Sequence, residues 1–355
     1  MISRPLIPSL VERLCPTTRY AGRGVCVAFV DAGFFPHADL RLPRGRIRAY
    51  VDVTRDQPEP SELLERKAWS WHGTMTTCCA AGNGYLSGGR YRGLASECDV
   101  VLVKAKEESE DVRAEHLVAA FEVPLRHPGL GVRVVSVSIG LDPDDPRARD
   151  VERAVDRLAK AGIIVVAAAG NVPDRAPTAP ASAASAITVG GFDDGGTLDL
   201  GDDKPWPSSH GNGKPDLIAP AAWVPAPMVP GTLEAREAQA LYDLLTVLEE
   251  MALEPSKIEA QAESSADLLE RVTERIALQK YIARDYQHVD GTSFAAPIVA
   301  SIVAQMLEAN GALTPADVRA GLLQTARKLA NVPRDVQGAG LVHASAAVEW
   351  AESRR

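Results

Sequence analysis

A serine at the start of an almost entirely apolar helix pattern could act as a nucleophile. The stretch "HVDGTSFAAPIVASIVAQMLEANG" (288–311) opens with a Gly-Thr-Ser turn and continues as a helix predicted to be buried on nearly every side. At the positive end of that helix, free backbone amides would stabilise negative charge developing near Ser293. The alternative is an ordinary helix start, with Thr292 or Ser293 as the N-cap and Pro297 in the first turn. Nucleophilic chemistry requires in addition a base and an orienting acid.

Three other side chains could complete that chemistry. Asp31 ends the apolar stretch "VAFVD", and His72 in "SWHGTMTTCCAAG" opens a helix of small residues, the same arrangement as at Ser293. Asn171 follows "GIIVVAAAG" and offers an amide donor. Taken singly, a strand-end aspartate is more often a turn residue, and a lone histidine is more often structural. The remaining histidines are interpreted as structural, namely His37, His116, His127, His210, His288 and His343.

The elements that must position these residues alternate between short apolar runs and amphipathic segments. The apolar runs predict strands at 24–31, 99–105, 132–140, 162–170 and 186–192. The segments at 115–127 and 148–162 predict helices between them. Fully apolar strands joined by crossover helices indicate an α/β fold with a parallel sheet covered on both faces. Ligands of such sheets bind beyond the carboxyl ends of the strands, where Asp31 and Asn171 are expected.

The chain order of Asp31, His72 and Ser293 is one of the known orders of acyl-transfer triads. With "VDAG", "HGT", "GTSFAAP" and "AAAGN" around the four residues, the chain resembles the subtilisin-like (subtilase, S8-type) serine peptidases. Further stretches resemble the same family, namely "VVSVSIG", "GKPDLIAPA" and "GAGLVHASAAV". The resemblance spans about residues 20–350, interrupted by a helical segment. It implies a three-layer subtilisin-like fold with a mainly parallel central sheet.

The resemblance implies a role for each residue. Ser293 would attack the scissile carbonyl, His72 would take and return its proton, and Asp31 would hold the imidazole and stabilise its cation. The side-chain amide of Asn171 and the backbone N–H of Ser293 would bind the oxyanion. Two backbone walls would bind an extended peptide, formed by Ser138, Ile139 and Gly140 and by Ala168, Ala169 and Gly170. The small or apolar walls predict an uncharged residue before the scissile bond, and the family pattern predicts a cis Ala179–Pro180 peptide.

Several positions depart from the family pattern. Ala32 stands where Ser or Thr is usual, and Met75 stands where a second histidine is common. No cofactor or metal is assigned, and calcium is the one ion suggested, because Asp39 matches a position that often ligates calcium in secreted members. The stretch "GNGYLSGGRYRGLAS" is longer than the family's calcium-binding loop and matches it poorly. The acidic run at 193–203 is interpreted as a solvated hairpin.

A helical, charged segment interrupts the family pattern immediately before the serine turn. Two apolar stripes with Pro255 between them predict a helical hairpin. We therefore expect an N-terminal tail at 1–20, a catalytic domain at 21–230 and 287–350, and an insertion at 231–286. The insertion is expected to restrict access to the cleft or to bind a regulatory partner, the alternative being an exposed decoration packed on itself.

The tail contains "LIPSL", which faintly resembles a cleft-blocking motif of intracellular members, the alternative being a simple docked tail.

Composition narrows the class of protein. The 38 basic and 47 acidic side chains give a net charge of −9, which argues against nucleic acid or an anionic membrane as a partner. The apolar runs are too short to cross a bilayer, and the first residues lack the apolar core of a secretory signal. Five cysteines, with Cys78 and Cys79 adjacent, fit buried thiols in a reducing compartment. A cytoplasmic location is therefore expected.

The leading interpretation is a cytoplasmic serine endopeptidase that cleaves a protein or peptide substrate through an acyl-enzyme, regulated by its insertion or its tail. A second interpretation keeps the acyl-enzyme but lets an amine replace water, as in subtilase-like peptide-maturing acyl transferases. A third is a catalytically silent scaffold that binds without reacting. The presence of all four chemistry-bearing residue types argues against the third.

Overall fold

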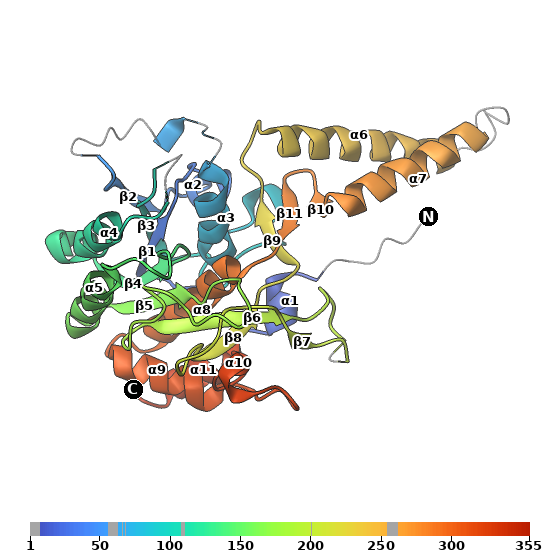
Figure 1. Cartoon of the computed structure of the whole chain (residues 1–355). Coiled ribbons are helices and arrows are strands. Elements are labelled where there is room, and N and C mark those ends of the chain that lie inside the picture. Colours follow the sequence, from blue (N-terminus) through green and yellow to red (C-terminus); the bar gives the residue numbers. More distant parts are fainter. Residues whose placement is uncertain are drawn as a thin grey trace.

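A mainly parallel sheet forms the middle layer of the protein (Figure 1). The computed structural model describes residues 8–55, 63–65, 67, 69–107, 111–199, 201–253 and 262–355. The strands follow the order β2-β3-β1-β4-β5-β6-β7, with β8 beside β6. Their bounds are β1 Cys26–Asp31, β2 Ile47–Asp52, β3 Asp99–Lys104, β4 Val132–Val137, β5 Ile164–Ala168, β6 Ile187–Asp193, β7 Lys204–Pro205 and β8 Leu217–Pro220. These strands pair in parallel, apart from the antiparallel pair of β6 and β7.

Helices cover both faces of this sheet and complete three layers. One face packs against α3, α8, α9 and α11, and the other packs against α4 and α5. Their bounds are α3 Ser70–Ala81, α4 Ala114–Arg126, α5 Ala148–Lys160, α8 Thr292–Ala309, α9 Pro315–Thr325 and α11 Ala344–Glu352. Shorter helices include α1 Leu10–Leu14, α2 Ala38–Arg41, α10 Arg334–Gln337 and the 3₁₀ turns Tyr85–Ser87 and Pro128–Leu130. The three-layer α/β fold expected from the sequence is confirmed.

Burial on both faces explains why the strands are apolar along their length. In β1, Val27 and Phe29 pack on the α3 and α8 side, whereas Ala28 and Val30 pack on the α4 and α5 side. Burial of each large apolar side chain contributes roughly 1.5–3 kcal/mol, so polar residues are disfavoured within the strand. The first polar side chain of β1 is that of Asp31, at its carboxyl end.

Helix α8 runs through the core and carries Ser293 in its first turn. It packs against β4, β5, β6 and β8 and against helix α3. The helix is long and apolar enough, by length and composition, to cross a membrane, but 89% of it is buried inside the protein, as in a core helix. Gly291 precedes it with a φ of 133°, a backbone conformation that favours glycine. The buried helix gives Ser293 a rigid support.

Two long helices project from the body as an arm, which comprises α6 Leu233–Leu253 and α7 Ala262–Leu278 (Figure 1). The seam between them buries Leu245, Leu248, Val272 and Ile276. The arm stands on a three-stranded antiparallel sheet, β10-β11-β9, with bounds β9 Val224–Pro227, β10 Tyr281–Ala283 and β11 Tyr286–Val289. Both helices lie within the residues expected for the insertion, and the predicted break at Pro255 lies outside the described residues. The turn that carries Ser293 follows β11 directly.

All five cysteines are free thiols. Cys26, Cys78, Cys79 and Cys98 are buried, but Cys15 is exposed, so the expectation of buried thiols is wrong at Cys15. Burial raises the pKa of Cys26 to about 11 and the pKa of Cys98 to about 12. Because the thiolate is the reactive form, these two thiols stay protonated and unreactive at neutral pH.

Candidate active site

The structure brings Asp31 and His72 into direct contact. Asp31 ends β1, and His72 lies in the first turn of α3. The Nδ1 atom of His72 lies 2.7 Å from Oδ1 of Asp31, whose side chain is 1% exposed. Gly73 permits this approach, because a Cβ atom there would lie 2.3 Å from the carbonyl oxygen of Gly33 and 2.9 Å from Cβ of Asp31. The glycine of the "HGT" stretch is therefore needed for packing.

Two further donors hold the Asp31 carboxylate. The backbone N–H of Ala32 donates to Oδ1 at 2.7 Å, and the Thr76 hydroxyl donates to Oδ2 at 3.0 Å. Ala32 lacks the hydroxyl that is usual at its position, and Thr76 supplies one from helix α3 instead. Sequence reasoning missed Thr76. The available signal was its spacing, because residues four apart on a helix share one face and His72 lies four positions earlier.

The environment of His72 shifts its pKa. Burial lowers the pKa of the ring, but the negative charge of Asp31 and the hydrogen bond to it raise the pKa, and the net direction is upward. The side chain remains 22% exposed, so the ring can be reached from solvent. Trp71 contacts the ring edge-on at 5.2 Å between centroids, and Phe294 lies 5.9 Å away on α8. His72 is thus held beside the start of α8 as a strengthened base.

Ser293 is held against the end of β4. Its hydroxyl donates to the carbonyl oxygen of Ser138 at 3.3 Å, and the Ser138 hydroxyl donates to the carbonyl oxygen of Ser293 at 2.8 Å. Within the described residues, the serine proton is therefore directed to a backbone carbonyl and not to His72. A rotation about the Cα–Cβ bond of Ser293 to another staggered position would release that proton.

The Asn171 amide is oriented by Thr292. Oδ1 of Asn171 accepts from the Thr292 backbone N–H at 3.0 Å and from the Thr292 hydroxyl at 2.8 Å. The Thr292 hydroxyl in turn accepts from the Gly170 N–H at 3.1 Å. Because two donors occupy the oxygen, the NH₂ group of Asn171 is the end left to donate elsewhere. Sequence reasoning considered Thr292 only as one of two possible helix caps and missed this orienting contact.

The two expected peptide-binding walls lie at the carboxyl ends of neighbouring strands. Ser138, Ile139 and Gly140 follow β4, and Ala168, Ala169 and Gly170 end or follow β5, which pairs with β4. Gly170 adopts a φ of 103°, and a Cβ there would lie 2.8 Å from the Ser209 hydroxyl. Ala169 is buried, so its side chain packs inside the protein. The expected cis bond at Ala179–Pro180 is confirmed.

The surroundings of Asp39 do not fit calcium. The Tyr286 hydroxyl lies 3.0 and 2.9 Å from the two carboxylate oxygens, and Nδ1 of His37 lies 3.5 Å from Oδ1. Cys78 completes a buried group whose ligand atoms lie within 4.8 Å of one another. Calcium prefers six to eight oxygen ligands, whereas this group offers one nitrogen, one sulfur and one carboxylate. Burial, followed by the charge of Asp39, raises the pKa of Tyr286, so its hydroxyl stays a donor.

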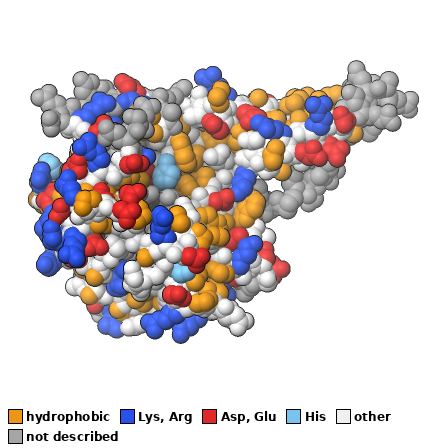
Figure 2. Space-filling model, viewed as in Figure 1, with side chains coloured by type: hydrophobic (Ala, Val, Ile, Leu, Met, Phe, Trp, Pro, Cys, Tyr) orange, Lys and Arg blue, Asp and Glu red, His pale blue; other side chains and the backbone are white. Residues whose placement is uncertain are grey.

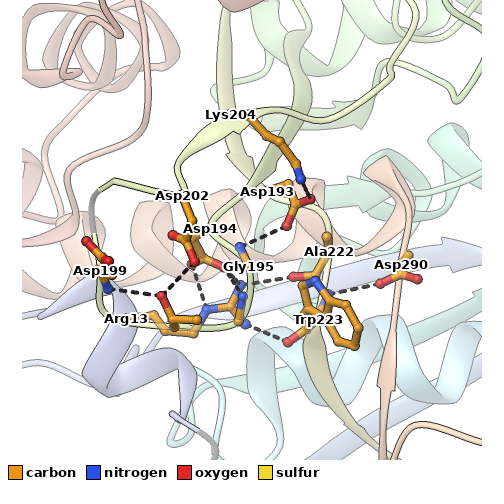
Figure 3. Close-up of polar contacts among 12 residues, drawn as sticks. Arg13, Asp193, Asp194, Gly195, Asp199, Asp202, Lys204, Ala222, Trp223 and Asp290 are labelled. Atoms are coloured by element: carbon orange, nitrogen blue, oxygen red, sulfur yellow. Dashed lines mark hydrogen bonds and ion pairs between the residues drawn. The ribbon is translucent and has the colours of Figure 1, made fainter. Parts of the chain in front are cut away.

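The acidic run at 193–203 forms the connection between the antiparallel strands β6 and β7 over its described residues. Most of its side chains are exposed, as expected of a solvated hairpin, but Asp194 is buried. Asp194 pairs with Arg13, which approaches from the N-terminal helix α1 (Figure 3). No local pattern could indicate this pair, because its members lie 181 positions apart.

Comparison with known proteins gives relatives along most of the chain. The model of the subtilase family (Peptidase_S8) matches residues 22–340. Serine protease AprX of Bacillus subtilis (strain 168) is 29% identical over 342 residues, which cover 92% of this chain and 66% of AprX. Alkaline elastase YaB of Bacillus sp. (strain YaB) is 25% identical over 332 residues, which cover 92% of this chain and 65% of the elastase. The chain thus spans just under two thirds of the length of these relatives.

Two solved structures share the fold. The prenylagaramide maturation protease PagA aligns with a TM-score of 0.62 and 20% identity, covering 94% of this chain and 95% of PagA. A serine-to-alanine mutant of the protease domain of PatA aligns with a TM-score of 0.64 and 19% identity, covering 96% and 99% of the two chains. The family model matches most of the chain, residues 22–340, and this match shows that the chain belongs to the subtilase family.

Proposed function

We propose that the protein is a serine endopeptidase that cleaves peptide bonds through an acyl-enzyme, with Ser293 as nucleophile, His72 as base and Asp31 as the orienting acid. The observation that carries this proposal is the 2.7 Å contact between Asp31 and His72 beside the first turn of α8. Membership of the subtilase family and the similarity to AprX, a serine protease, support the same chemistry.

The proposed reaction assigns one step to each of these residues. Ser293 turns from the Ser138 carbonyl and attacks the scissile carbonyl, while Nε2 of His72 takes the hydroxyl proton. The oxyanion accepts from the NH₂ group of Asn171 and from the backbone N–H of Ser293, which has no partner within its own helix in the first turn. His72 then gives the proton to the leaving amine, and a water molecule repeats the sequence to release the acid.

Fluorophosphonate labelling tests the proposal directly, because the reagent forms a bond only with an activated serine. We expect wild-type protein to gain one label at Ser293, detected by mass spectrometry of the intact chain and of its peptides. The Ser293→Ala variant should gain none, and Ser301→Ala, a buried serine on the same helix, should label like the wild type. Absence of labelling in folded wild-type protein would support the silent scaffold.

Acyl transfer to an amine is the second candidate function. It is favoured by one observation, the shared fold with PagA, a maturation protease that aligns over 94% of this chain. Products distinguish the two reactions. A peptide substrate is incubated with a second peptide whose free amino group can attack the acyl-enzyme. If water attacks, the only acyl product is the free acid. If an amine attacks, a joined or cyclised peptide forms.

We further propose that the arm regulates access to the cleft or binds a regulatory protein. The arm continues through β11 into the Ser293 turn, and the Gln287 amide on β11 contacts Sδ of Met75 on helix α3 at 3.8 Å. A groove of about 620 Å³ on the arm is lined by Leu241, Leu268 and Leu278 among others. Apolar side chains show at the surface of the arm among charged ones (Figure 2). With nine acidic and three basic side chains in α6 and α7, the arm would suit a partner that combines apolar and basic residues.

Removal of the arm tests its regulatory role. Residues 233–278 can be replaced by a short Gly-Ser linker that retains β9, β10 and β11. If the arm restricts access, we expect kcat/KM for a folded protein substrate to rise about tenfold, with kcat/KM for a short chromogenic peptide within about twofold of wild type. Unchanged kinetics and specificity on both substrates, in a variant with an unchanged melting temperature, would contradict the proposal that the arm restricts access to the cleft.

A further inference from the structure

The N-terminal helix α1 is anchored to the body, although it lies outside the residues that carry the proposed chemistry. Ser9 caps it, with its backbone N–H donating to the Glu12 carboxylate at 2.7 Å and its hydroxyl accepting from the Glu12 N–H at 3.3 Å. Leu10 is 2% exposed and belongs to the main apolar core. The helix therefore holds Arg13 in a fixed position against the molecule.

The side chain of Arg13 is buried, and every nitrogen of its guanidinium group donates a hydrogen bond (Figure 3). Nε donates to Oδ2 of Asp194 at 2.7 Å and Nη2 donates to Oδ1 at 2.5 Å, a bidentate pair. Nη1 donates to the carbonyl oxygen of Trp223 at 2.6 Å, and Nη2 also donates to that of Ala222 at 2.9 Å. A guanidinium that is 1% exposed requires such complete pairing, because an unpaired buried charge is strongly destabilising.

The two carbonyls that Arg13 binds belong to a constrained turn. Trp223 has a φ of 54°, which a residue other than glycine adopts only at a cost. Adjacent carbonyl groups that point at one place repel each other, and the cation between them removes that repulsion. Lysine could replace the charge but not the planar fork that reaches the Asp194 carboxylate and both carbonyls together.

This turn supports the residues that precede the nucleophile. The Gly291 N–H donates to the carbonyl oxygen of Ala221 at 2.7 Å. The Trp223 N–H donates to Oδ1 of Asp290 at 2.9 Å, and Lys280 pairs with Asp290 while lying 4.3 Å from the centre of the Trp223 ring. A continuous set of contacts therefore leads from Arg13 through the turn at 221–223 to the Gly-Thr-Ser turn.

We propose that Arg13 is a positioning residue for the peptidase reaction, so that helix α1 holds the turn at 221–223 and, through it, the backbone of Gly291 to Ser293. The inference rests on the proposed function for its kinetic consequence. Its structural consequence, that Arg13 holds the nucleophile turn in place, can be measured without activity. Loss of the planar guanidinium group would loosen the oxyanion donors and the serine together. We therefore expect a larger effect on kcat than on KM.

The test compares Arg13→Lys, Arg13→Ala and Asp194→Asn with wild type. Arg19→Lys serves as the matched control, because Arg19 is also N-terminal and paired, with Glu352 at 2.7 Å, but its side chain is 59% exposed. At about 20 °C below each melting temperature, we expect Arg13→Lys to lower kcat and the fluorophosphonate rate constant about tenfold, with KM within about twofold. Hydrogen exchange of peptides spanning 286–293 should be faster in the three variants and unchanged in the control.

Chemical rescue gives a second measurement. In Arg13→Ala, added guanidinium at a few millimolar, far below denaturing concentrations, should restore part of the labelling rate and of the exchange protection, whereas methylammonium should not. A lowered melting temperature with unchanged kcat, labelling and exchange in Arg13→Lys and Asp194→Asn would overturn the proposal. If wild type is not labelled, the proposed function fails, and the exchange data alone decide whether Arg13 holds the turn.

Discussion

Replacement of His72 by alanine is expected to lower kcat for a peptide substrate by roughly 10⁶-fold, the size established for a subtilisin triad that loses its base. The physical reason is that the serine hydroxyl is a weak nucleophile unless its proton is removed as the bond forms. His72 is the proposed base, it lies 2.7 Å from a buried carboxylate beside helix α8, and no other group is expected to replace it. KM should change little, because the proposed backbone walls, and not His72, would bind the substrate.

The same residues should act as one unit. Ser293→Ala alone is expected to cost about as much as His72→Ala, and the double variant should be no slower than either, since each loss already removes the shared step. His127→Ala, which removes an exposed histidine, provides the matched control and should keep wild-type kcat. Turnover of His72→Ala within about tenfold of wild type, or losses that multiply in the double variant, would contradict the assignment.

Asp31→Asn is expected to lower kcat by about 10⁴-fold, because an amide at this position favours the wrong imidazole tautomer and cannot stabilise the imidazolium. The variant tests a second property. In the wild type, Asp31 raises the pKa of His72 against the opposing effect of burial. Activity requires the neutral ring, so it should rise with pH as His72 loses its proton. Without the Asp31 charge, the pKa of His72 falls, and the acidic limb of the remaining activity should move to lower pH.

A profile of kcat/KM against pH between about 5 and 9 would measure this shift, with intact folding checked by circular dichroism at each pH. Thr76→Val is the matched comparison, because it removes one hydrogen bond from Asp31 and keeps the negative charge. Its acidic limb should stay close to that of the wild type. An acidic limb in Asp31→Asn that stays in place or moves to higher pH would show that another group controls the profile.

Much of the fold could be predicted because the signals were local. The apolar runs at 24–31, 132–140 and 162–170 correspond to β1, β4 and β5, since strands buried on both faces must be apolar throughout. The small strands could not be predicted in this way. β7 has two residues, and β9 contains two prolines, so neither carries a period. β7 pairs with β6 across the acidic connection, and β9 pairs with β11 across the whole arm, and no local pattern marks either pairing.

The residues of the candidate site also fall into those that the sequence could predict and those that it could not. The motif residues Asp31, His72, Asn171 and Ser293 could be predicted, because each lies at the end of an element and in a recognisable stretch. The residues that orient them could not, since a threonine such as Thr76 looks like any other helix residue until its partner is known. The burial of Arg13 is the extreme case, because its partner Asp194 lies in a loop that sequence reasoning interpreted as solvated.

The pairing of β9 with β11 makes the base of the arm a site where the fold can tolerate inserted segments. Val224 to Pro227 lie in register with Val289 to Tyr286, so the two ends of the long excursion are joined whatever lies between them. Once its ends are joined, each doubling of a flexible loop costs only about 0.6 kcal/mol in closure entropy. Modules of quite different length could therefore be grafted at this point, giving one subtilase scaffold many different attachments.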